Sequence, residues 1–179
     1  MAAGLVVGLL LFAACGGSSA TVAESASGAD EPAPLADIDG PFPVGERIPV
    51  EKTFERFDGS SGTFGELRGK PVLLNFWASW CPACIAELPD LVEAHATYGK
   101  DVTFVGIAQA DQRSGSLEFA ERFAITYTLA DDPQGDLYRQ FESISMPVSI
   151  LLDSEGTVLE RHNGILTSGQ LDEKLTALR

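Results

Sequence analysis

A buried-strand pattern that runs into a closely spaced pair of cysteines constrains the fold of this chain more than any other feature. Residues 71–77 form an almost continuous apolar run, which is typical of a strand covered on both faces. Cys81 and Cys84 follow shortly afterwards, and Pro89 comes next, where we expect a kink. Beyond the cysteines, apolar residues recur at helical spacing, at Ile85, Leu88, Leu91 and Val92. The segment therefore predicts a core strand followed by a helix, with both cysteines where the helix begins.

Strand and helix patterns alternate through the rest of residues 42–179. The expected strands are 53–57 and 62–64, joined by a turn, and then 102–108, 148–152 and 158–161. Further helices are expected to begin at Ser116, at Asp132 with Pro133 in its first turn, and at Thr167, where Thr167-x-x-Gln170 forms a capping box. This order predicts an α/β domain with a central mixed sheet flanked by helices, preceded by an N-terminal β-hairpin extension.

The first residues have the pattern of an export signal. Residues 4–14 are continuously apolar, which suits the hydrophobic region of a signal peptide and is too short to span a membrane. Ala13 and Ala14 stand directly before Cys15, an arrangement that resembles the lipobox of bacterial lipoproteins. That resemblance implies a signal peptide at 1–14, a lipid on the Cys15 thiol, and a protein tethered to the outer face of the bacterial cell membrane. An ordinary secretory signal or a buried hydrophobic N-terminus are the alternatives.

Residues 15–41 are expected to be a disordered linker between the lipidated cysteine and the folded domain. They are rich in Gly, Ser, Ala and Pro and carry acidic but no basic side chains. Their few apolar residues lack helical or strand periodicity, so burial cannot compensate for the entropy lost on ordering. The domain organisation is therefore 1–14, 15–41 and 42–179.

The charge balance excludes two classes of function. The chain has 26 acidic and 12 basic residues, a net charge of −14. Nucleic-acid binding needs basic residues to neutralise phosphates, and electrostatic attachment to anionic lipid needs a basic patch. We therefore expect no nucleic-acid partner, and expect membrane attachment through the N-terminal lipid instead.

The C-x-x-C spacing of Cys81 and Cys84 indicates thiol–disulfide chemistry. At a helix N-terminus, unsatisfied N–H groups and the helix dipole stabilise a thiolate, and thiols there have pKa values of about 3.5 to 7.5, compared with about 8.5 for a free cysteine. Cys81 is thus the candidate attacking thiolate, and Cys84, one turn later, the resolving thiol. Two alternatives are less favoured. A zinc site with His95 and His162 matches no common ligand spacing, and a structural disulfide closing so short a loop gains little entropy.

Two segments of the chain resemble a known family. Residues 69–84 have the sequence GKPVLLNFWASWCPAC and are followed by Glu87-Leu88-Pro89, and residues 145–156 have the sequence SMPVSILLDSEG. These segments resemble the TlpA/ResA/DsbE group of thioredoxin-like proteins, which are exported and often membrane-tethered thiol–disulfide oxidoreductases. The resemblance covers essentially residues 42–179 and implies a thioredoxin-like fold.

The resemblance also implies which residues form the site. It places a redox-active disulfide at Cys81–Cys84 and a cis-proline, Pro147, beside it, where the backbone of Met146 pairs with a substrate peptide. Trp80 is expected to flank the reactive thiol as a contact surface for clients, whereas Trp77 is expected in the core.

Glu87 is the implied proton handler. It lies one helical turn after Cys84, and in this group a glutamate there tunes the cysteines and moves the proton of the resolving thiol. Asn75 stands where cytoplasmic-type thioredoxins carry a buried aspartate, which makes Glu87 the more credible acid–base group. Without the resemblance, Glu87 would be interpreted as an ordinary solvated helix glutamate.

We therefore expect an extracytoplasmic thiol–disulfide oxidoreductase that exchanges its disulfide or dithiol with cysteine-containing client proteins and needs no cofactor or metal. Resemblance favours a reductant serving cytochrome c maturation or a similar client, recycled by a membrane thiol–disulfide partner. An oxidant or isomerase for secreted proteins stays open. So does a thioredoxin-fold copper(I) chaperone that uses both thiolates and His162, although its known relatives have C-x-x-x-C. A thiol peroxidase is disfavoured because Ala78 stands where a threonine is required.

Overall fold

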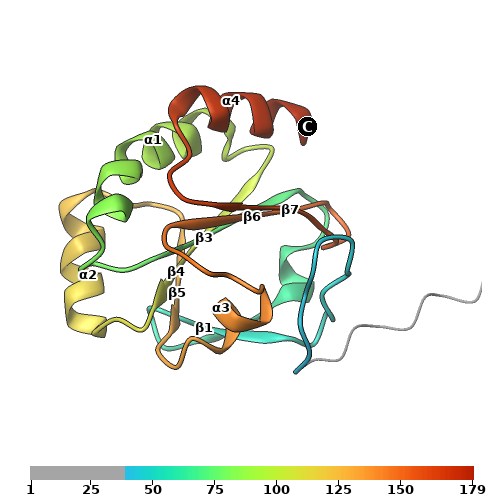
Figure 1. Ribbon diagram of the computed structural model, residues 1–179, viewed down its shortest axis with the longest axis horizontal. Helices are drawn as coiled ribbons and strands as arrows, with labels where there is room; N and C mark the ends of the chain where they lie inside the picture. Colours follow the sequence, from blue (N-terminus) through green and yellow to red (C-terminus); the bar gives the residue numbers. More distant parts are fainter. Residues whose placement is uncertain (1–38) are drawn as a thin grey trace, which may run out of the picture. The chain divides into compact units, whose positions relative to one another are not determined.

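A seven-stranded mixed sheet runs through residues 39–179, the part of the chain that this computed structural model describes (Figure 1). The strands are β1 (Thr53–Arg56), β2 (Ser61–Thr63), β3 (Val72–Trp77), β4 (Thr103–Gln109), β5 (Thr128–Asp132), β6 (Val148–Leu152) and β7 (Val158–Asn163). The helices are α1 (Pro82–Tyr98), α2 (Arg113–Arg122), α3 (Asp136–Gln140) and α4 (Ser168–Ala177), with a 3-10 turn, η1, at Phe64–Leu67. The strand order is β2-β1-β5-β4-β3-β6-β7.

β3 is the central strand, and its pairing makes the sheet mixed. It runs parallel to β4 and antiparallel to β6, with Asn75 opposite both Gly106 and Ser149. Every residue of β3 is buried, because helices or loops cover both faces of the sheet. The predicted mixed sheet with flanking helices is therefore confirmed.

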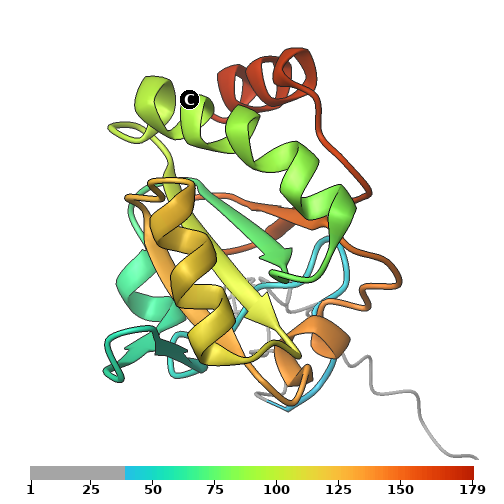
Figure 2. The same ribbon diagram turned by 90° about the vertical axis from the view of Figure 1, so that its left-hand side faces the viewer.

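Two hydrophobic clusters lie on opposite faces of this sheet. Leu73 and Trp77 of β3 pack on the side of α1, α2 and α4, where the Trp77 ring stacks on Phe119 with ring centroids 4.9 Å apart. Leu74 and Phe76 point to the other side, which α3 and the segment around residue 42 cover. Figures 1 and 2 show α1 and α4 side by side over one face. Alternate residues of one strand thus serve two cores, as strand geometry requires.

The N-terminal hairpin extends the sheet at one edge. β1 pairs antiparallel with β2 and also with β5, so the hairpin is continuous with the central strands. Gly62 in β2 allows this packing, because a Cβ atom there would lie 2.6 Å from the Phe54 ring. The predicted hairpin extension is confirmed.

Three elements differ from their predicted positions. α2 begins at Arg113 and not at Ser116, and the sequence analysis assigned no strand to β5. The helix expected from Asp132 and Pro133 begins only at Asp136, because Asp132 is the last residue of β5. Asp132 still caps that helix from the strand end, accepting hydrogen bonds from the N–H groups of Leu137 (3.3 Å) and Tyr138 (2.9 Å).

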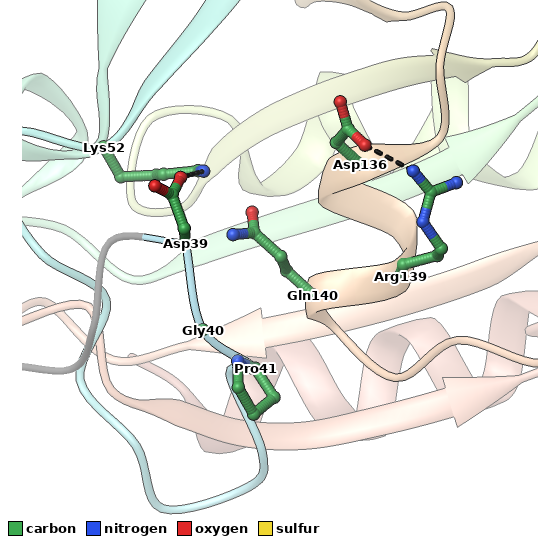
Figure 3. Close-up of a pocket in the computed structure, with 7 residues that line it drawn as sticks. All are labelled: Asp39, Gly40, Pro41, Lys52, Asp136, Arg139 and Gln140. Carbon is green, nitrogen blue, oxygen red and sulfur yellow. Dashed lines mark hydrogen bonds and ion pairs between the residues drawn. The ribbon is translucent and has the colours of Figure 1, made fainter.

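The predicted signal peptide, Cys15 and the linker up to residue 38 lie outside the described residues. Phe42, the first residue of the predicted domain, is fully buried, and its N–H donates to the Gln140 carbonyl (2.6 Å). Gln140 also lines the pocket in Figure 3, together with Asp39 and Lys52. Lys52 Nζ lies 3.8 Å from Asp39 Oδ1. Arg139 pairs with Asp136 in the same pocket. Among residues 39–179, no helix combines the length and the apolar character needed to cross a membrane.

Candidate active site

Cys81 and Cys84 lie where β3 leads into α1, and they form a disulfide with their Cα atoms 5.3 Å apart. Cys81 is the N-cap of α1, and its Sγ accepts a hydrogen bond from the Cys84 N–H (3.2 Å). Pro82 occupies the first helical position, where the missing N–H costs nothing. A sulfur that receives helix N-terminal N–H groups is stabilised as a thiolate once the disulfide is reduced. The local geometry therefore suits Cys81 for nucleophilic attack.

The Met146–Pro147 peptide is cis. Val148 pairs with Phe76, so Pro147 precedes β6 at the end of the sheet where β3 leads to the cysteines. Met146 packs against the hydrophobic cluster that contains both cysteines. The Pro147 carbonyl accepts a hydrogen bond from the Gly164 N–H (2.8 Å), which joins this loop to the one after β7.

Glu87 is fully buried beneath the site, so its interpretation as a solvated helix glutamate is wrong. Its Oε2 accepts a hydrogen bond from Asn75 Nδ2 (3.0 Å), and its Oε1 accepts one from the Leu166 N–H (2.7 Å). Desolvation by burial raises the pKa of Glu87 to about 7, although both hydrogen bonds act to lower it. A carboxyl group with this pKa exchanges protons readily near neutral pH.

A third buried polar side chain is hydrogen-bonded to Asn75, and sequence reasoning missed it. Ser149 of β6 is fully buried, and its Oγ accepts a hydrogen bond from Asn75 Nδ2 (3.2 Å). Its signal in the sequence is a lone polar residue within an apolar strand. Asn75 therefore holds Glu87 and Ser149 together from the central strand.

The two tryptophans have opposite environments, as expected. Trp77 is 2% exposed and belongs to the core, whereas Trp80, directly before Cys81, is 58% exposed. Trp80 Nε1 donates to the Ala110 carbonyl in the loop between β4 and α2 (3.4 Å).

That loop also carries Asp111, which sequence reasoning missed. The signal for Asp111 in the sequence was a polar residue just after β4. Because β4 runs parallel to β3 and parallel neighbours end at the same edge of a sheet, residues just after the two strands are expected to lie close together.

Each of the two histidines contacts residues other than the cysteines. His95 packs edge-on against Phe104 and Tyr127, and burial lowers its pKa. His162 lies on β7, with Nε2 3.4 Å from the Ile165 carbonyl oxygen. Within residues 39–179, no three His, Cys, Asp or Glu side chains are grouped so that they would hold a metal ion.

Known proteins resemble this chain in both sequence and structure. The Redoxin family model matches residues 43–177. The thiol-disulfide oxidoreductase ResA of Bacillus thuringiensis is 28% identical over 142 residues, which cover 76% of this chain and 82% of the relative. The structure of a secreted Mycobacterium tuberculosis disulfide oxidoreductase homologous to E. coli DsbE is 27% identical, with a TM-score of 0.66, covering 72% of this chain and 97% of that one. The exposed lipoprotein thioredoxin of Streptococcus pneumoniae is 26% identical, with a TM-score of 0.60, covering 70% and 98%.

Proposed function

Because this chain belongs to the Redoxin family and is a thiol–disulfide oxidoreductase of the ResA/DsbE type, we propose that it acts outside the cytoplasm as a reductant of disulfides in client proteins. The observation that carries the proposal is the charge along the segment that contains Cys81 and Cys84. Residues 78–90 contain two acidic side chains and no basic one, and one of the acids is the buried Glu87.

This distribution favours reducing chemistry. The N-terminus of α1 stabilises a thiolate, which favours the dithiol form and makes a cysteine pair more oxidising. A carboxylate at Glu87, one turn from Cys84, opposes that effect, because a nearby negative charge disfavours the thiolate. No basic side chain on the same segment offsets this carboxylate. The dithiol is therefore less stabilised and gives up its electrons more readily.

The proposed reaction has two exchange steps. The Cys81 thiolate attacks one sulfur of a client disulfide, and the other client sulfur leaves as a thiolate. Cys84 then transfers its proton to the Glu87 carboxylate and attacks the Cys81 sulfur. The Cys81–Cys84 disulfide forms, and the client is released with both of its cysteines reduced. The client gains two electrons, and the protein loses two.

Pro147, Met146 and Trp80 bind the client in this proposal. The Met146 backbone, beside cis-Pro147, pairs with the client's extended chain, and the exposed Trp80 ring provides an adjacent contact surface. The resemblance to the TlpA/ResA/DsbE group implies a client with paired cysteines, such as a cytochrome c precursor.

The proposed location is the outer face of the cell membrane, with a lipid on Cys15. Similar chains include one described as secreted and one described as an exposed lipoprotein, which supports this location. A membrane thiol–disulfide partner returns two electrons to the Cys81–Cys84 disulfide after each cycle.

The reduction potential of the Cys81–Cys84 pair tests the direction of the reaction. We expect a value near or below about −250 mV, measured by equilibration with a dithiol buffer of known potential. Glu87→Gln removes the buried charge and should raise the potential, whereas Glu93→Gln, at an exposed position on the same helix, should leave it unchanged. A value above about −180 mV would instead identify an oxidant or isomerase for secreted proteins.

A further inference from the structure

The loop between β4 and α2 is bonded to the two residues that precede Cys81. The Asp111 carboxylate accepts hydrogen bonds from the Ser79 N–H (2.6 Å) and from the Ser79 hydroxyl (3.0 Å). The neighbouring Ala110 carbonyl accepts the indole N–H of Trp80 (3.4 Å). Two consecutive loop residues therefore hold two consecutive residues of the active-site segment.

The surrounding structure holds this loop in an unfavourable backbone conformation. Ala110 has a φ of 47°, in the left-handed region that residues with a Cβ atom rarely adopt. Its N–H donates to the Asp132 carbonyl at the end of β5 (3.1 Å), which secures the conformation. Such backbone geometry persists only where the neighbouring contacts require it, and it is concentrated at functional sites.

α2 supports the same contact from its first turn. The Ser116 hydroxyl, in a fully buried residue, donates to Asp111 (2.8 Å). A Cβ atom at Gly115 would lie 3.2 Å from the Ser79 hydroxyl oxygen, so glycine allows the close approach of the two segments. Burial acts to raise the pKa of Asp111, but the hydrogen bonds from Ser79 and Ser116 outweigh it and hold the pKa below its ordinary value. Asp111 is therefore a charged acceptor at neutral pH.

We propose that Asp111 is a positioning residue for client exchange, which acts by holding Ser79 and thereby the Trp80 ring in the orientation that a client polypeptide meets. The inference rests on the proposed function, because it takes Trp80 as a client contact. An exposed tryptophan without such support samples several rotamers, and a client would have to immobilise it on binding. Because Asp111 already holds the Trp80 ring before the client binds, binding loses less side-chain entropy. A small disulfide does not cover Trp80, so the benefit is specific to polypeptides.

A double-mutant cycle tests this inference, with insulin as the polypeptide disulfide and glutathione disulfide as the small one. Asp111→Asn should lower kcat/KM for insulin about ten-fold, the loss expected for a charged hydrogen bond, and lower the glutathione rate by a clearly smaller factor. Trp80→Ala should have a similar effect on insulin. Because Asp111 acts through Trp80, the double variant should be no slower towards insulin than Trp80→Ala alone.

Two further variants separate positioning from loss of structure. Asp153→Asn is the matched control, because the Asp153 carboxylate also caps a turn, accepting hydrogen bonds from the Glu155 and Thr157 N–H groups, but at the opposite end of β6. It should leave the ratio of the insulin rate to the glutathione rate unchanged. Ser79→Ala keeps the backbone hydrogen bond to Asp111 and should lower the same ratio by a smaller factor than Asp111→Asn does. It tests the inference even if Asp111→Asn fails to fold.

Two outcomes would overturn the inference. Equal slowing of both substrates by Asp111→Asn would place its effect on the cysteines themselves, and additive losses in the double variant would show that it does not act through Trp80. The rates are measured in both directions, from the dithiol with insulin and from the disulfide with reduced insulin chains. A protein that proves to be an oxidant would refute the proposed direction, while the substrate ratio would still report on Asp111.

Discussion

Glu87 is a titratable group placed in the core of the domain, and its protonation is therefore coupled to stability. The side chain is fully buried between β3 and the loop after β7, where Asn75 and the Leu166 N–H bind it. Hydrogen bonds satisfy the carboxylate but do not replace the hydration lost on burial, so the pKa of Glu87 is raised above its ordinary value. The same burial that lets Glu87 exchange protons near neutral pH makes its ionised form costly for the folded state.

We predict that this cost appears as pH-dependent stability. The pKa of Glu87 is about 7 in the folded protein against an ordinary value of 4.5, so its stabilising contribution is complete below about pH 4.5 and is lost as the pH rises through 7. Glu87→Gln should remove this dependence and be more stable than the wild type at pH 8, by about 3 kcal/mol at most. Urea unfolding of the oxidised proteins at pH 5 and pH 8 measures the difference. A wild-type slope that survives in Glu87→Gln would contradict the assignment.

The two cysteines should respond differently to substitution. Cys81→Ser removes the attacking thiolate and should abolish exchange, whereas Cys84→Ser leaves the attack intact and prevents resolution. We expect Cys84→Ser to accumulate mixed disulfides with a client, visible as reducible adducts on non-reducing gels or by mass spectrometry. If both variants trap clients equally, the assigned roles are wrong.

At the scale of elements, the N-terminal end of α4 helps to position a backbone N–H group that binds Glu87. Leu166, which donates its N–H to Glu87, directly precedes Thr167, the N-cap of α4. The Thr167 side chain and Gln170 form the predicted capping box, and α4 packs along α1. The cap therefore sets where α4 begins and keeps the preceding backbone N–H near the buried carboxyl group.

Loss of this cap should destabilise the domain. Thr167→Ala removes the acceptor for the Gln170 N–H and should lower the free energy of unfolding by about 1 kcal/mol. Ser168→Ala, one residue later at an exposed position, is the matched control and should change stability by much less. Urea denaturation of the oxidised proteins measures both. Equal effects of the two substitutions would argue against the cap.

The elements that sequence patterns predicted poorly are those that depend on neighbours. β5 has the sequence Thr-Leu-Ala-Asp-Asp, which carries no clear alternation, and it is a strand because it pairs with β1 on one side and β4 on the other. Asp132 has a side chain typical of a helix N-cap, but it is the last residue of β5. From there its carboxylate accepts hydrogen bonds from the N–H groups of Leu137 and Tyr138 across a turn. Tertiary pairing outweighs local propensity at both positions.

At the scale of the whole molecule, the proposed function includes attachment of the folded domain to a membrane through Cys15, which lies outside the described part of the chain. Phe42 is the first residue of the predicted domain and is fully buried, so the N-terminal end of the domain is packed into its core. We predict that Cys15→Ser, expressed in a bacterium, moves from the detergent phase to the aqueous phase in a detergent partition experiment. Its rate of exchange with clients in solution should be unchanged. A wild-type protein already in the aqueous phase would contradict lipidation.

The sequence by itself determined the class of fold and the position of the cysteine pair at the start of a helix. An apolar strand, a C-x-x-C pair at a helix start and a capping box are local patterns, and each depends on interactions between residues close together in the chain. Only the tertiary structure decided the environment of those residues. The hydrogen-bond partners of the buried Glu87 are Asn75 from β3 and Leu166 from a distant loop, and Asp111 meets Ser79 because β3 and β4 run side by side. Hydrophobic periodicity specifies which face of an element is buried, but pKa values and hydrogen-bond partners depend on which residues the fold brings to that face.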